Sequence, residues 1–174
     1  MSPAAAARLA ATVFVAAIVQ VSAISSLTVL GATPDLLLVV LVSAALLRGS
    51  VTGAVAGFAA GLIVDIATLG TLGVTALLFT LTGYWAGRYG ETTGRDRVHA
   101  PLLVVLVATA LYGIGAYLLT YMLGEAVSAR TALWPVLPAM LLNGLLAYPV
   151  HGLLQRLVGR SEPAPRIREM ELLV

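Results

Sequence analysis

Two acidic residues next to apolar runs are the first candidates for chemistry. Asp35 follows Thr33 and Pro34, the pattern of a helix N-cap, a proline at the first helical position and an acid in the first turn. Capping is therefore the favoured explanation of Asp35. Asp65 lies about one turn before the predicted end of an apolar helix, where capping does not account for it. A buried acid is a functional candidate, with Arg130 or a donor in another subunit as the expected partner, and a structural ion pair or hydrogen bond as the alternative.

The other polar residues within apolar stretches form no catalytic pattern. Asn143 lies between Pro138 and Pro149, where we expect an interhelical hydrogen bond or a bond to carbonyls that the prolines leave free. His99 and His151 have no second His or acid at metal-ligand spacing. The chain contains no cysteine, P-loop, HExxH, GxSxG or carboxylate pair suited to phosphotransfer. We therefore expect no enzymatic activity, metal or cofactor.

The composition places these residues in a membrane protein. Of the 174 residues, 60% are hydrophobic and 10% are charged, and the mean hydropathy is +1.00. Soluble domains average about 45–50% apolar and about 25% charged residues, so this chain lacks the polar surface of a soluble fold. The net charge is +2, but the basic residues are scattered between apolar runs, so nucleic acid is not an expected partner.

Six apolar segments are expected to cross the membrane as helices, which makes the fold class all-α and polytopic. A bilayer core of about 30 Å needs roughly 20 apolar residues in a helix. The segments are 9–30, 34–47, 51–68, 71–86, 101–123 and 132–158. The second is short for a span, and turn residues and a polar loop over 88–100 separate the segments. Residues 1–160 are expected to form one transmembrane domain, and residues 161–174 a flexible cytoplasmic tail.

The distribution of arginine predicts that both termini are cytoplasmic. With the N-terminus inside, nine arginines fall on the cytoplasmic side and Arg130 alone falls outside, which satisfies the positive-inside rule. Arg48, Arg88 and Arg156 are the expected anchors at the cytoplasmic interface. A re-entrant hairpin over 34–68 would instead place Arg48 in hydrocarbon at a cost of a few kcal/mol, so two full spans are favoured.

A row of glycines is the strongest packing signal. Gly53, Gly57 and Gly61 recur every four residues, so they share one face of the predicted third helix. Small residues let a neighbouring helix approach closely. Packing within the chain is the favoured interpretation, and docking of a partner helix is the alternative. Gly83 and Gly87 repeat the spacing once on the fourth helix, which is a weaker signal.

Several short motifs, taken in order, resemble the rod-shape-determining protein MreD family. They are Pro34-Asp35-Leu36, the pattern G-F-x-x-G-x-x-x-D from Gly57 to Asp65, Leu72-Gly73, Ala76-Leu77, Tyr84, Trp134-Pro135, Tyr148-Pro149 and the Arg156/Arg160 ending. The resemblance covers about 9–160, and the order of the motifs, the number of spans and the length carry it together. The Gly/Ala-rich third helix and the Pro/Glu/Arg tail depart from the family pattern.

The resemblance implies a non-enzymatic subunit of the bacterial cell-elongation complex in the plasma (inner) membrane. Proteins of this family are thought to bind the membrane protein MreC and to support peptidoglycan synthesis by RodA and its penicillin-binding transpeptidase. The MreB filament lies on the cytoplasmic side. The fold of the family is similar to the six-helix S-component of energy-coupling-factor transporters. Asp35, Asp65 and the three glycines of the third helix are then candidate partner or helix-packing residues.

That similarity of fold supplies the alternative function, a vitamin-capturing S-component. Such a site needs several convergent polar or aromatic groups in a pocket. The predicted outer half offers only Asp35, Asp65, Glu125, Arg130 and Trp134, joined by very short loops. A membrane enzyme of lipid chemistry is disfavoured further, because its acidic metal-binding motifs are missing.

Overall fold

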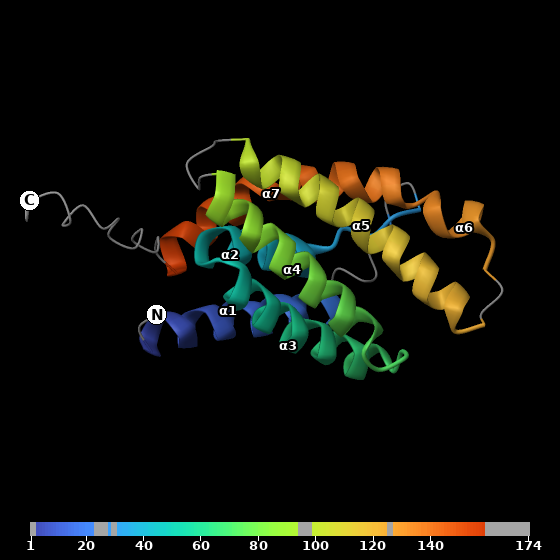
Figure 1. Cartoon of the computed structure of the whole chain (residues 1–174), viewed down its shortest axis with the longest axis horizontal. Helices are drawn as coiled ribbons and strands as arrows, with labels where there is room; N and C mark the ends of the chain where they lie inside the picture. The colour runs from blue at the N-terminus through green and yellow to red at the C-terminus, as the bar shows by residue number, and fades with distance from the viewer. Residues whose placement is uncertain (1–2, 23–27, 29–30, 94–98, 125–126, 159–174) are drawn as a thin grey trace, which may run out of the picture.

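The computed structural model describes residues 3–22, 28, 31–93, 99–124 and 127–158, and within these ranges the chain is helical with no strand. The helices are α1 (Pro3–Ser22), α2 (Leu36–Arg48), α3 (Ser50–Thr68), α4 (Val74–Thr93), α5 (Ala100–Met122), α6 (Ala129–Leu133) and α7 (Val136–Val158). Figure 1 shows them gathered into one bundle. The all-α prediction is therefore confirmed. The predicted tail lies outside the described residues.

Several predicted boundaries of α1 and α4 differ from the structure. Helix α1 begins at Pro3 rather than at residue 9, and α4 begins at Val74 rather than at residue 71. Helix α1 ends at Ser22, well before the predicted end at residue 30, and most of the interval lies outside the described residues. Helix α4 continues to Thr93, so the first part of the predicted polar loop is helical. Its Gly90 is buried against the backbone of Leu46 in α2, and this packing prolongs the helix.

The sixth predicted helix is divided in two. It begins at Ala129 and is interrupted at Trp134 and Pro135, which separate the short α6 from α7. Two prolines, Pro135 and Pro138, remove two backbone N–H donors within one turn, and each ring also crowds the carbonyl four residues earlier. The helix is therefore interrupted where both effects coincide.

Helix α2 is the centre of the bundle. Every residue from 37 to 47 is at most 5% exposed, and α2 contacts α1, α3, α4, α5 and α7. Thirteen residues extend only about 20 Å at 1.5 Å each. A helix enclosed by other helices need not match the thickness of the lipid, because protein covers its ends and sides. This position accounts for the short second segment.

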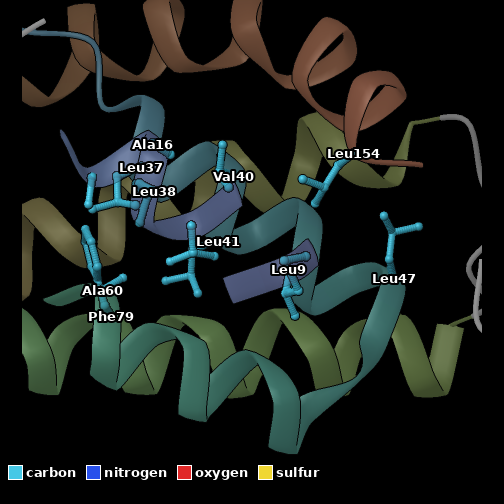
Figure 2. Close-up of a cluster of buried hydrophobic side chains, with 13 residues drawn as sticks. Leu9, Ala16, Leu37, Leu38, Val40, Leu41, Leu47, Ala60, Phe79 and Leu154 are labelled. Atoms are coloured by element: carbon cyan, nitrogen blue, oxygen red, sulfur yellow. The ribbon is translucent and has the colours of Figure 1, made fainter. Parts of the chain in front are cut away.

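The core is built around α2 from aliphatic side chains and one ring. Figure 2 shows Leu37, Leu38 and Leu41 of α2 among side chains of the surrounding helices, including Leu9, Phe79 and Leu154. A second buried cluster on α2 joins Val39, Val42 and Leu46 to residues of α4, α5 and α7. Both faces of α2 are thus buried, which explains why its sequence is apolar all round.

The outer surface of the bundle is apolar and suited to lipid. Large side chains such as Val51, Leu141 and Leu145 are each more than 70% exposed. Four segments of the described chain are long and apolar enough to span a membrane: Ala5–Ser22, Ser50–Thr68, Ala100–Met122 and Ala129–Leu157. Soluble monomeric proteins rarely expose so large and continuous an apolar surface. The chain is therefore a multi-pass membrane protein.

Four arginine-bearing helix ends lie together. Helix α1 begins, and α2, α4 and α7 end, at the same end of the bundle (Figure 1). These termini carry Arg8, Arg48, Arg88 and Arg156. We call this side of the bundle the arginine end.

Candidate functional site

The glycine row of α3 packs directly against the backbone of α4. A Cβ atom at Gly57 would lie 2.6 Å from the carbonyl carbon of Phe79, whereas carbon atoms in contact are about 3.5–4.0 Å apart. A Cβ at Gly53 would meet the carbonyl of Gly83, and one at Gly61 would meet the backbone of Ala76. All three positions therefore require glycine, because no side chain fits between the two helices.

Helix α4 contributes glycines to the same contact. A Cβ at Gly83 would meet the carbonyl of Gly53, and one at Gly87 would meet the backbone of Gly49 and Ser50. We call the five residues Gly53, Gly57, Gly61, Gly83 and Gly87 the glycine seam. The sequence pattern ranks Gly83 and Gly87 as a weaker signal, but in the structure they are as tightly enclosed as the glycines of α3. Because α4 fills this face, no partner helix can dock on it in this conformation.

Asp65 closes one end of the seam. Its side chain is only 3% exposed, and its Oδ2 accepts hydrogen bonds from the backbone N–H groups of Gly73 at 2.8 Å and Ala76 at 3.3 Å. Its Oδ1 accepts a third from Thr75 at 3.2 Å. Asp65 thus caps the start of α4, where the first amides lack helical partners and a negative charge is favourable.

This geometry changes two expectations about Asp65. The prediction that it has a polar partner is confirmed, but its hydrogen bonds come from backbone amides of the following turn and helix rather than from Arg130. Capping does explain the residue, although the helix that it caps is the next one along the chain. The sequence pattern misses this because an acid near the C-terminus of one helix caps another only when the turn between them is tight.

Glu91 closes the other end of the seam. Its Oε1 accepts hydrogen bonds from the backbone N–H of Ser50 at 2.8 Å and from the Ser50 hydroxyl at 3.1 Å. The bond from the Ser50 N–H is the main cause that lowers the pKa of the Glu91 carboxyl below 4.5, with Arg88 at 3.6 Å contributing. Glu91 lies beyond the predicted span 71–86, on the arginine end. It caps α3, which has no cap from its own preceding residue, Gly49.

Glu91 is the residue that sequence reasoning missed. No capping pattern near Ser50 points to it, because Gly53 stands where a capping box would have Glu. The available signal was the spacing of Gly83, Gly87 and Gly90, which indicates one closely packed face of α4. In the structure, Gly83 and Gly87 pack against the start of α3, and Gly90 packs against α2. Glu91 follows this row directly.

The two carboxylates form a reciprocal pair. Asp65, near the end of α3, caps the start of α4, and Glu91, near the end of α4, caps the start of α3. Together with the glycine seam they make what we call the α3/α4 clamp. Each carboxylate is committed to backbone amides, so the arrangement is built to hold two helices together rather than to transfer protons.

A second polar network lies at the start of α2. Asp35 is itself the N-cap of α2, since its Oδ1 accepts a hydrogen bond from the N–H of Leu38 at 2.9 Å. The expectation that Thr33 is the cap and Asp35 lies in the first turn is therefore wrong by two residues. The backbone N–H of Asp35 donates to Asn143 Oδ1 at 2.7 Å, and Asn143 Nδ2 donates to the Thr109 hydroxyl at 3.1 Å.

This network ties four helices together. Gln20 of α1 accepts a hydrogen bond from the N–H of Leu36 at 2.8 Å and donates to the carbonyl of Pro34 at 3.1 Å. The expected interhelical bond of Asn143 is thus present, and Asn143 is completely buried. A depression of about 290 Å³ lies beside it, lined by residues that include Asp35 and Tyr112. The bonds satisfy the first amides of a buried helix, whose loss of hydration would otherwise be costly.

The three expected anchor residues are distributed over the arginine end. Arg48 is partly buried at the end of α2, Arg88 has a side chain that is 57% exposed, and Arg156 is exposed in the last turn of α7. Thus the structure brings Asp65 and the glycines of α3 together in the clamp, while Asp35 belongs to the separate network. Within the described ranges, no group of three or more His, Cys, Asp or Glu could hold a metal ion.

Comparison with known proteins agrees with the resemblance found in the sequence. The sequence model of the family described as "rod shape-determining protein MreD" matches residues 6–157. The cell shape-determining protein MreD of Streptococcus pneumoniae is 31% identical over 90 residues, which cover 51% of this chain and 54% of that protein. The alignment therefore spans about half of the relative's length.

No solved structure matched the chain. The similarity to the S-component fold therefore remains an expectation, and the comparisons do not favour a vitamin-capturing function. The family match instead runs from α1 to the last turn of α7, through both the α3/α4 clamp and the Asp35 network. The chain accordingly belongs to the MreD family of cell shape-determining membrane proteins.

Proposed function

We propose that this chain is a non-enzymatic subunit of the bacterial cell-elongation complex in the plasma membrane. It binds MreC and supports peptidoglycan synthesis by RodA and the penicillin-binding transpeptidase, with the MreB filament on the cytoplasmic side. The single observation that carries the proposal is the MreD family match over residues 6–157. The two carboxylates of the α3/α4 clamp both accept hydrogen bonds from backbone amides, which supports a role in binding rather than catalysis.

The proposed topology has six spans, with both termini and the arginine end in the cytoplasm. Helix α4 runs antiparallel to α3 along the glycine seam, since Gly53 faces Gly83 and Gly61 faces Ala76. A helix paired in this way with a spanning helix must itself cross the membrane. Arg8, Arg48, Arg88 and Arg156 then face the cytoplasm, as the positive-inside rule requires.

Reporter fusions test this topology. Fusions after Thr93 and after the C-terminal residue should both report the cytoplasm, and a fusion after Gly70 should report the outside. An external signal from either of the first two would refute the arrangement with both termini inside.

We propose that the membrane helix of MreC binds in the groove between α1 and α3. The glycine seam is filled by α4, so the partner needs another surface. This groove has a volume of about 720 Å³ and an almost wholly apolar lining, which includes Ala10, Phe14, Val55 and Ala59. It follows α3 from Val51 to Ile63, about 18 Å at 1.5 Å per residue. The alanines permit the close approach on which helix association in membranes depends.

Filling the groove with one large side chain tests whether MreC binds there. Val55 is 66% exposed, so Val55→Trp adds bulk to the groove without entering the core. We expect this variant to keep its yield and melting temperature but to lose co-purification of MreC and to fail to restore rod shape in cells depleted of the native protein. Leu145→Trp, at a 77% exposed site on α7 outside the groove, is the matched control.

The outcomes distinguish failure of the proposed function from failure of the proposed binding site. If wild-type protein does not co-purify MreC or restore rod shape, the proposed function is wrong. If wild type does both and Val55→Trp does so equally well, the proposed function stands and the α1–α3 groove is not the binding site of MreC.

A further inference from the structure

Two arginines from opposite ends of the chain line one depression. Arg8 in the second turn of α1 and Arg156 in the last turn of α7 face a hollow of about 450 Å³ that is otherwise lined by Ala11, Thr12 and Leu157. Both are exposed, and both lie at the arginine end of the bundle. The fold therefore concentrates two positive charges at a single point of the surface.

This pair of charges has no counter-ion among the described residues. No acidic side chain is among those that line the depression, and no ion pair is formed there by Arg8 or Arg156 within the described ranges. Arg88 at the same end differs, because Glu91 lies 3.6 Å from it. Two guanidinium groups beside one hollow repel each other unless an anion lies between them.

The depression continues into an apolar groove between α1 and α7. This groove has a volume of about 390 Å³ and shares Ala11, Thr12 and Leu157 with the arginine depression. Farther from the arginines it is lined by aliphatic side chains that include Val15, Val19, Val40 and Leu153. A continuous site with two arginines at one end and aliphatic walls beyond them matches a molecule with an anionic head and a hydrocarbon chain.

We propose that this groove binds one anionic phospholipid of the leaflet at the arginine end. The two guanidinium groups hold the phosphate, for which arginine offers paired N–H donors, and one acyl chain lies along the α1–α7 groove. Basic pockets between membrane helices recognise lipid head groups in this way. A lipid with a neutral zwitterionic head binds more weakly, because its own ammonium competes with the arginines for the phosphate.

The test uses the full chain purified in dodecyl maltoside. Phosphatidylglycerol should raise the melting temperature in a saturable manner and remain as a single adduct in native mass spectrometry, whereas phosphatidylcholine should do neither. One arginine near a membrane surface strengthens binding of anionic lipid about fivefold, so Arg8→Gln with Arg156→Gln should weaken the apparent affinity about 25-fold.

Two further variants keep the test decisive. Arg8→Lys with Arg156→Lys retains the charges without the paired donors, so it should bind phosphatidylglycerol more tightly than the double Gln variant and less tightly than wild type. Both positions are exposed, so the double Gln variant without added lipid should melt as wild type does, which shows that its loss of binding is not unfolding. Arg130→Gln removes one charge from α6, at the opposite end of the bundle, and this variant should bind phosphatidylglycerol as wild type does. Equal stabilisation by phosphatidylcholine, or an unchanged phosphatidylglycerol affinity in the double Gln variant, would overturn the proposal.

Discussion

Gly57→Ala is the smallest change that tests the glycine seam. The added methyl group would lie 2.6 Å from the Phe79 carbonyl carbon and 3.0 Å from the Thr80 nitrogen, both of which belong to backbone. A flexible side chain could rotate away from the new atom, but a helix backbone cannot. The two helices must therefore separate by about 1 Å to reach ordinary van der Waals distance.

The magnitude follows from that separation. A gap of about 0.5–1 Å forfeits roughly a quarter to a half of the dispersion energy at each contact, and overpacking typically costs about 1–3 kcal/mol. Alanine returns up to about 1 kcal/mol through its higher helix propensity. We expect a net loss of about 1–2 kcal/mol, equivalent to a fall of about 2–8 °C in melting temperature for a chain of this length.

The assay is thermal unfolding of the purified protein in detergent, with Gly152→Ala as the matched control. A Cβ at Gly152 meets nothing within 4 Å, so the control should melt at or slightly above the wild-type temperature. Gly83→Ala should lose about as much as Gly57→Ala, because a Cβ there meets the Gly53 carbonyl. If Gly57→Ala melts like the control, the close packing of α3 on α4 is wrong.

Three further predictions concern the polar groups. Asp65→Asn should lower the melting temperature of the isolated protein, because the charge-assisted hydrogen bonds from three backbone amides at and just before the start of α4, worth about 1.5–3 kcal/mol each, are weakened; an unaltered melting curve would show that the cap does not stabilise α4. The pKa of the Glu91 carboxyl in the folded protein is lowered from its ordinary value of 4.5 by the bond from Ser50. The stabilisation that this bond gives the folded protein is therefore complete above pH 4.5 and is lost as the pH falls through the lowered pKa. The difference in melting temperature between wild type and Glu91→Gln should then be full at pH 7 and shrink in acid, and a constant difference would contradict the Ser50 bond. Asn143→Leu should cost about 1–3 kcal/mol by leaving the partly buried N–H of Asp35 without an acceptor, and chemical unfolding that gives no loss would refute the role of this network.

The helices were predicted well and their ends less well. Long apolar runs are properties of local composition, so the all-α class and the approximate place of each helix follow from the sequence. The ends depend on contacts that a local pattern does not contain. Gly90 suggests a turn, but packing against Leu46 keeps it helical, and Pro135 with Pro138 interrupts a segment whose hydropathy is continuous.

The polar site shows the same division. The periodicity of Gly53, Gly57 and Gly61 was enough to predict a close helix contact, because spacing by four defines one face of a helix. The pattern did not name the opposing helix, and it left a partner protein as an alternative. It also could not assign the bonds of Asp65, since a carboxylate one turn from a helix end has several candidate donors.

What the sequence determined by itself was the solvent and the architecture of the chain. A composition of 60% hydrophobic and 10% charged residues requires lipid, and apolar runs in lipid must form helices because backbone groups there have no water to bind. Only the tertiary structure decided which groups meet. Glu91 caps Ser50 from 41 residues away, and Asn143 accepts from the Asp35 backbone across 108 residues. Such bonds are selected by the way the helices pack around the buried α2, because hydrogen bonds form only where packing brings donor and acceptor within about 3 Å.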